Sequence, residues 1–225
     1  MERFSGDLAG RGLEVVSDAI CPWCYVGKRR LAKALALLAP EGLTFAVRWL
    51  PFQLNPDMPK GGVDRRAYRT RKFGSWERSQ ALDARVAAVG AGEGLAFRHD
   101  LMARTPNTFD AHRLVWLAGR EGTQDAVVDG LFAAYFVEGR DIGEPGVLAD
   151  VGAAAGLDRA RVLAMLAGEE GAAEVAAEER AARRLGVEAV PTFLLDGRPL
   201  VAGAQEPGLL AAELRDAVRV RVGTA

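Results

Sequence analysis

The order of the predicted strands and helices limits the fold of this 225-residue chain more strongly than any other sequence feature. Residues 12–18 have the short apolar pattern of a β-strand, and residues 22–38 carry apolar side chains at helical spacing. Pro40 and Gly42 end this helix, and residues 43–50 follow as a second strand. The nearly continuous apolar character of that strand is typical of a buried parallel strand. The first fifty residues therefore predict a β-α-β unit.

A long block with a helical pattern follows this unit. Its predicted helices cover residues 63–73, 75–90, 108–121, 124–138, 145–155, 158–166 and 169–185. Strand patterns return at 192–195 and 199–202, and the Asp-Gly pair between them favours a hairpin. A last helix is predicted over 207–220.

This order has the layout of a thioredoxin-like fold of the α/β class, interrupted by helices. We expect one discontinuous thioredoxin-like domain made of residues 12–61 and 187–221. The residues between them, 62–186, are expected to form an all-helical insertion domain between the βαβ half and the ββα half.

The only two cysteines of the chain lie in Cys21-Pro22-Trp23-Cys24, at the junction of the first strand and the first helix. Two thiols with this spacing on a first helical turn can close and reopen a disulfide ring with little backbone movement. Free N–H groups and the helix dipole favour a thiolate at Cys21, which we expect to be the nucleophile. Cys24 is expected to be the resolving thiol, and Pro22 suits the first helical position. The pair predicts a redox centre.

A zinc site is the main alternative use of two cysteines with this spacing. A closed structural zinc site needs two more ligands, and the chain offers only His99 and His112, which lack the usual local spacing. We therefore expect no metal site. His112 is expected to cap or pack at the start of a helix.

Charge and hydropathy exclude several other functions. A net charge of −1 lacks the positive excess that non-specific nucleic-acid binding requires, so no nucleic-acid partner is expected. Basic residues between Arg65 and Arg78 are expected to form a solvated helix face. No segment is apolar enough for a signal peptide or a membrane span, so we expect a cytoplasmic protein without a membrane partner. In a reducing compartment, a lone cysteine pair is more readily explained by catalysis than by a structural disulfide.

Four separated motifs make the chain resemble a known family. They are DAICPWCYVGKRRL at 18–31, PFQLNP at 51–56, NTFDAHRL at 107–114 and GAQ at 203–205. With the cysteine pair after the first strand and Val190-Pro191-Thr192 before the third, the chain resembles the DsbA family of thioredoxin-fold oxidoreductases. The motifs look like those of its cytoplasmic FrnE-like branch, and the similarity covers residues 12–218.

The resemblance implies a cis peptide bond between Val190 and Pro191, with Pro191 against the Cys21 sulfur. Proline is the residue at which a cis bond costs least, and it presents no N–H. The resemblance also implies that the Val190 backbone pairs with an extended substrate, while Pro22 and Trp23 support the active site. A second resemblance, to the kappa-like glutathione-dependent branch named below, implies that glutathione as a co-substrate would contact Asn55, Val190, Ala204 and Gln205.

The leading hypothesis is a thiol–disulfide oxidoreductase or isomerase that acts on protein or peptide substrates. Its only redox group would be the Cys21–Cys24 pair, without a further cofactor, in a monomer or a homodimer. One alternative is a glutathione-dependent transferase or isomerase of the kappa-like, 2-hydroxychromene-2-carboxylate isomerase branch. Enzymes of that branch generally have Ser in place of Cys21 and lack Cys24. Another alternative is a non-catalytic peptide-binding chaperone that uses the groove beside Pro191.

Overall fold

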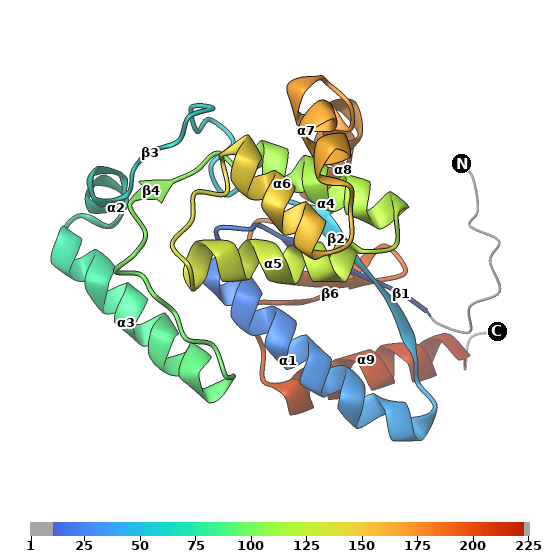
Figure 1. Ribbon diagram of the computed structural model, residues 1–225. Coiled ribbons are helices and arrows are strands. Elements are labelled where there is room, and N and C mark those ends of the chain that lie inside the picture. The colour runs from blue at the N-terminus through green and yellow to red at the C-terminus, as the bar shows by residue number, and fades with distance from the viewer. Residues whose placement is uncertain (1–10, 223–225) are drawn as a thin grey trace.

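The computed structural model describes residues 11–222, with side chains described as far as Arg219. Within this range a four-stranded sheet has the strand order β2-β1-β5-β6. The strands are β1 (Arg11–Ser17), β2 (Phe45–Pro51), β5 (Thr192–Leu195) and β6 (Arg198–Ala202). Strand β1 pairs parallel with β2 and antiparallel with β5, and β5 pairs antiparallel with β6 (Figure 1).

Helix α1 connects the two parallel strands and packs against the last helix, α9. The helices of the described residues are α1 (Pro22–Leu38), α2 (Arg65–Phe73), α3 (Trp76–Gly92), α4 (Phe109–Arg120), α5 (Gln124–Phe136), α6 (Pro145–Ala154), α7 (Arg159–Ala167), α8 (Ala172–Arg184) and α9 (Pro207–Val222). A β-α-β unit and a β-β-α unit on one sheet, with α2 to α8 between them in sequence, form a thioredoxin-like fold with inserted helices. The predicted fold class is confirmed.

The predicted elements coincide with the observed ones apart from a few terminal residues. The hairpin also lies where the Asp-Gly pair predicts it, with positive φ angles at Asp196 and Gly197. Sequence patterns missed the two-residue strands β3 (Val63–Asp64) and β4 (Arg104–Thr105), which pair antiparallel. Two residues are too few to show a period.

Strand β2 corrects one expectation, because it lies at the edge of the sheet and only alternate residues are covered. Trp49 is buried, whereas Ala46 and Arg48 are exposed. The side chain of Gln124 accepts a hydrogen bond from the Trp49 N–H at 2.8 Å and donates one to its carbonyl oxygen at 3.2 Å. This side chain from α5 thus pairs part of an otherwise open strand edge.

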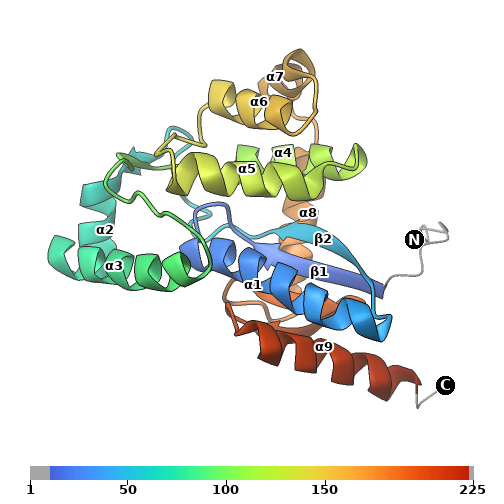
Figure 2. The same ribbon diagram turned by 60° about the horizontal axis from the view of Figure 1, so that its bottom comes forward.

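An aromatic cluster joins the first turns of α1 to the helical block. The Tyr25 ring stacks on Phe132 with centroids 5.0 Å apart, and it meets Phe97 edge to face at 5.9 Å. Figure 2 shows α2 and α3 as a pair beside the N-terminal end of α1, and α6 and α7 as an outer layer beyond α4 and α5. The start of α1 is therefore held between the sheet and the inserted helices. None of the described helices has the length and apolar character needed to cross a membrane.

Candidate active site

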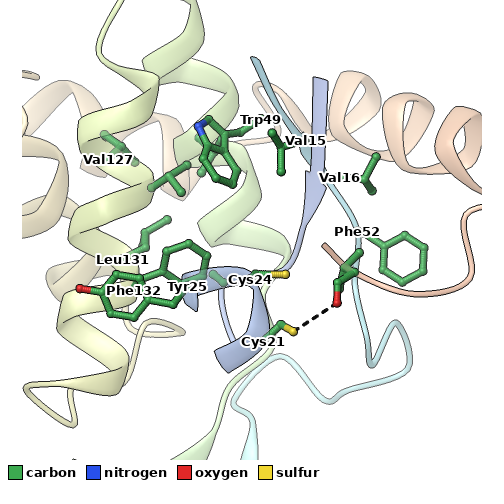
Figure 3. Close-up of a cluster of buried hydrophobic side chains, with 14 of the residues drawn as sticks. Val15, Val16, Cys21, Cys24, Tyr25, Trp49, Phe52, Val127, Leu131 and Phe132 are labelled. Carbon is green, nitrogen blue, oxygen red and sulfur yellow. Dashed lines mark hydrogen bonds between the residues drawn. The ribbon is translucent and has the colours of Figure 1, made fainter. Parts of the chain in front are cut away.

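The first turn of α1 carries both cysteines (Figure 3). Cys21 is the N-cap, with an extended backbone, and Pro22 occupies the first helical position. The Cys24 N–H donates to the Cys21 carbonyl oxygen at 3.0 Å, which closes the turn. Both cysteines are thiols in this structure; Cys21 is 5% exposed and Cys24 is fully buried. An incoming sulfur atom can therefore reach Cys21 before Cys24.

A loop from the far end of the sequence lies against Cys21. The Cys21 thiol donates a hydrogen bond to the Val190 carbonyl oxygen, with 3.6 Å between sulfur and oxygen (Figure 3). The Val190–Pro191 peptide bond is cis, and the Pro191 carbonyl oxygen accepts a hydrogen bond from the Gly203 N–H at 2.7 Å. The sheet thereby presents Val190 and Pro191 to the start of α1.

Close packing of Gly27 on Pro191 fixes this arrangement. A Cβ atom at Gly27 would lie 2.8 Å from Pro191 Cγ and 3.7 Å from Ala204 Cβ. Only a residue without a side chain allows α1 to approach the proline this closely. Ala204 is held in turn by Arg30, whose guanidinium donates to the Ala204 carbonyl oxygen at 2.8 Å.

Burial raises the pKa of the Cys24 thiol well above its ordinary value, and the adjacent Cys21 raises it further. The Ser17 side chain and the Asp18 backbone lower this pKa but offset only part of the rise. Cys24 is consequently a thiol at neutral pH, and it must lose its proton before it can act as a nucleophile.

Asp18 is a buried carboxylate that holds the loop in front of Cys21. Its side chain accepts hydrogen bonds from the Leu54 N–H at 2.8 Å and the Ile20 N–H at 3.5 Å. Its backbone carbonyl accepts from the Cys21 N–H at 3.0 Å. The Nε2 atom of His112 lies 3.5 Å from Asp18 Oδ1 but outside hydrogen-bond geometry. A sequence signal for Asp18 existed: an acid directly after an apolar strand, within the motif around the cysteines.

A cavity of about 320 Å³ opens beside the cysteine pair. Cys21, Pro22, Trp23 and Asn55 line it, together with residues of α2, α3 and α5. The structure thus brings four of the predicted site residues to one space. The others are placed elsewhere: Val190 at the Cys21 sulfur, Pro191 and Ala204 against Gly27, and Gln205 beside Ala202, to which its amide donates.

The basic segment after Gly62 corrects a second expectation, because it is not simply a solvated helix face. Arg65 is only 3% exposed, and its guanidinium donates to Asp83 at 2.6 Å. Arg69 donates to the other oxygen of the same carboxylate, also at 2.6 Å. Both arginines line the cavity, together with Lys72. Helical periodicity could not predict the burial of these arginines, because the packing of α2 on α3 determines which face of α2 meets Asp83.

No group of three or more His, Cys, Asp and Glu side chains that could hold a metal ion occurs among the residues that the structure describes. The two thiols of this site can exchange with an external disulfide or form a disulfide with each other.

These features define a class of protein: a thioredoxin-like fold with two thiols at a helix start and a cis-proline loop against the outer one. The DSBA-like thioredoxin domain model matches residues 12–215, and the chain belongs to this family of thiol oxidoreductases. Membership of the DsbA family, predicted from the motifs, is confirmed.

Solved structures agree with the family assignment. The crystal structure of a probable DsbA oxidoreductase from Streptomyces coelicolor has a TM-score of 0.83 and 37% identity, over 92% of this chain and 89% of that one. The cytosolic disulfide reductase DsbM from Pseudomonas aeruginosa has a TM-score of 0.65 and 26% identity, over 93% and 99%. DsbM is also known in a structure with GSH. A 2-hydroxychromene-2-carboxylate isomerase, with a TM-score of 0.70 and 18% identity over 95% and 99%, shares the fold.

Proposed function

We propose that this protein is a thiol–disulfide oxidoreductase in which Cys21 attacks the substrate and Cys24 resolves the mixed disulfide. The observation that carries the proposal is the position of the Cys21 sulfur, which contacts the Val190 carbonyl oxygen and retains the access that Cys24 lacks.

The reducing direction proceeds in two exchanges. The Cys21 thiolate attacks one sulfur of a substrate disulfide, forms a mixed disulfide and releases the other sulfur as a thiolate, which takes a proton from water. Cys24 then loses its proton to solvent and attacks the Cys21 sulfur. The substrate leaves as a second thiol, and the protein keeps a Cys21–Cys24 disulfide. Two electrons pass from the protein to the substrate, and the reverse sequence oxidises a dithiol. Isomerisation of a protein disulfide would use the first exchange, followed by attack of a different substrate thiolate on the mixed disulfide, which forms the new substrate disulfide and releases the Cys21 thiolate without Cys24.

We further propose a cytoplasmic, FrnE-like enzyme that accepts protein or peptide substrates and also glutathione. The Val190 backbone beside Cys21 can pair with an extended chain of any sequence, which suits protein substrates. Glutathione and the cytoplasm are supported by the relative DsbM, described as a cytosolic disulfide reductase and solved with GSH.

Two cysteine variants test this mechanism. Cys21→Ser should abolish disulfide reduction. In the Cys24→Ser variant, Cys21 should still attack the substrate, and the resulting mixed disulfide should accumulate and be detectable by mass spectrometry. Because serine has nearly the volume of cysteine, both variants should fold, and circular dichroism can check this. Full turnover in both variants would refute the mechanism.

A kappa-like glutathione transferase or isomerase is the weaker alternative, because this chain keeps both thiols of the pair. Its signature would be glutathione conjugation that continues after alkylation of Cys21.

A further inference from the structure

The cavity beside Cys21 has the size of a small-molecule site. Its volume of about 320 Å³ lies within the range of ligand pockets. Cys21 and Trp23 line it, together with a wall from the segment inserted between β2 and β5. Part of that wall is apolar, formed by Phe73, Leu82, Val86, Met102 and Phe136. A compact organic group could lie there with a sulfur atom next to Cys21.

The charged part of the wall carries an excess of positive charge. Among the described residues that line the cavity, Asp83 is the only acidic one, whereas Arg65, Arg69, Lys72 and Arg85 are basic. Asp83 is shared between Arg65 and Arg69 at 2.6 Å each, so one carboxylate faces two guanidinium groups. Within the part of the chain that the structure describes, these two largely buried cations share Asp83 as their ion-pair partner, so one of them lacks a counter-charge of its own.

Neighbouring groups do not supply the missing negative charge. Burial lowers the pKa of Arg69, which is the expected effect on a cation that is removed from water without full compensation. Burial raises the pKa of Tyr135, so this phenol stays neutral. Burial also lowers the pKa of His99, and its buried Nε2 has no hydrogen-bond partner among the described residues. Both side chains line the cavity.

A polar group connects this wall to the cysteine loop. The Asn55 side-chain oxygen accepts hydrogen bonds from the Tyr68 hydroxyl and from Lys72 Nζ, the latter at 3.2 Å. Lys72 Nζ also donates to the Tyr68 hydroxyl at 2.8 Å. These two hydrogen bonds place the ammonium group of Lys72 next to Asn55 at the cavity. Lys72 is exposed, so a ligand can contact its ammonium group.

We propose that this cavity binds the carboxylate of a low-molecular-weight disulfide or thiol, through Arg69 and Lys72, while its sulfur reacts at Cys21. A carboxylate supplies the charge that the wall lacks and accepts charge-assisted hydrogen bonds from both side chains. The inference rests on the proposed function, to which it adds a substrate class and a second binding surface, distinct from the Val190 backbone.

The first test compares two small disulfides in single-turnover oxidation of the reduced protein. The anionic substrate is 3,3′-dithiodipropionate and the neutral one is 2-hydroxyethyl disulfide, each rate being divided by its rate with free cysteine. We expect the anionic substrate to be preferred. Lys72→Gln and Arg69→Gln should each lower the ratio of anionic to neutral rates by about tenfold, which corresponds to about 1.4 kcal/mol.

Two matched variants control this comparison. Arg71→Gln removes a charge from the same helix at an exposed position outside the cavity, and it should leave the ratio unchanged. Arg69→Lys keeps the positive charge. If Arg69→Gln acts by removing the contact with the ligand, Arg69→Lys should retain most of the preference for the anionic substrate. An equal fall of the ratio in Arg71→Gln would overturn the proposal, because the effect would then come from net charge alone.

The second test measures binding without exchange chemistry. Suberate has the length of 3,3′-dithiodipropionate but no sulfur, and 1,8-octanediol is its neutral counterpart. Calorimetry should show that the wild type binds suberate more tightly than the diol, and that Arg69→Gln/Lys72→Gln loses this difference.

The outcomes separate the cavity proposal from the proposed function. Binding of suberate by a protein that reacts with no disulfide would refute the proposed function but would still support the cavity proposal. Disulfide exchange without charge preference and without suberate binding would overturn the cavity proposal alone. A charge preference seen only with acidic peptide disulfides would also overturn it, in favour of an acidic protein side chain.

Discussion

The Cys21 sulfur lies 3.6 Å from the Val190 carbonyl oxygen, although 169 residues separate them in the chain. The contact joins the start of α1 to the cis-proline loop before β5. A substrate that approaches Cys21 therefore meets a fixed backbone carbonyl as well as a thiol. Residues that hold these two segments together should affect exchange without taking part in it.

Gly27→Ala should impair this junction, because the added Cβ would lie 2.8 Å from Pro191 Cγ. We expect the free energy of unfolding to fall by about 1–3 kcal/mol, as for other overpacked sites, together with slower exchange at Cys21. Urea unfolding and single-turnover kinetics measure the two effects. Gly146→Ala is the control: no atom lies within 4 Å of its added Cβ, and a helical position should gain up to about 1 kcal/mol. Equal effects of both substitutions would contradict the close approach to Pro191.

Resolution of the mixed disulfide should accelerate as the pH rises. Burial raises the pKa of Cys24, and this cause persists when Cys21 is bound to substrate. Below that pKa the reactive thiolate fraction of Cys24 grows tenfold per pH unit, so the resolution rate should follow with the same slope. Rapid quenching of the mixed disulfide between about pH 6 and 9 gives this rate. A rate independent of pH over this interval would show that Cys24 is already deprotonated.

Asp83→Asn should destabilise the helical block strongly. The substitution leaves Arg65 and Arg69 buried without their shared carboxylate, and loss of one partner of a buried ion pair costs about 3–5 kcal/mol. Thermal or urea unfolding measures the loss. Asp100→Asn is the matched control, since its ion pair with Arg98 is exposed to solvent and should contribute little to stability. Similar losses in the two variants would argue against a special role for the buried network.

Asp18→Ala should both destabilise the protein and slow exchange. The fully buried Asp18 side chain accepts hydrogen bonds from the Leu54 and Ile20 N–H groups. A buried donor left unpaired lowers the free energy of unfolding by about 1–3 kcal/mol. The loop before Cys21 would lose its anchor, so the rate of attack by Cys21 should fall as well. Asp18→Asn keeps one acceptor oxygen and should retain more stability than Asp18→Ala. Unchanged exchange kinetics in a folded Asp18→Ala protein would show that Asp18 does not position Cys21.

Features that depend on neighbouring residues could be predicted from the amino-acid sequence. The helix that begins at Pro22, the thiols on its first turn and the two-residue turn at Asp196 and Gly197 follow from local rules of spacing, proline and positive φ. The order of strands and helices, together with four short motifs, was enough to predict the fold and the family.

The groups that meet at Cys21 from distant parts of the chain could not be predicted, because they are brought together by the packing of the elements. Helical periodicity places Arg65 and Arg69 on a basic helix, but the position of α3 turns them toward Asp83 and the cavity. Likewise, nothing near Asn55 in the sequence predicts its contact with Tyr68. The physical reason is that spacing along a chain defines the faces of a single element, whereas the packing of elements against one another defines what each face encounters.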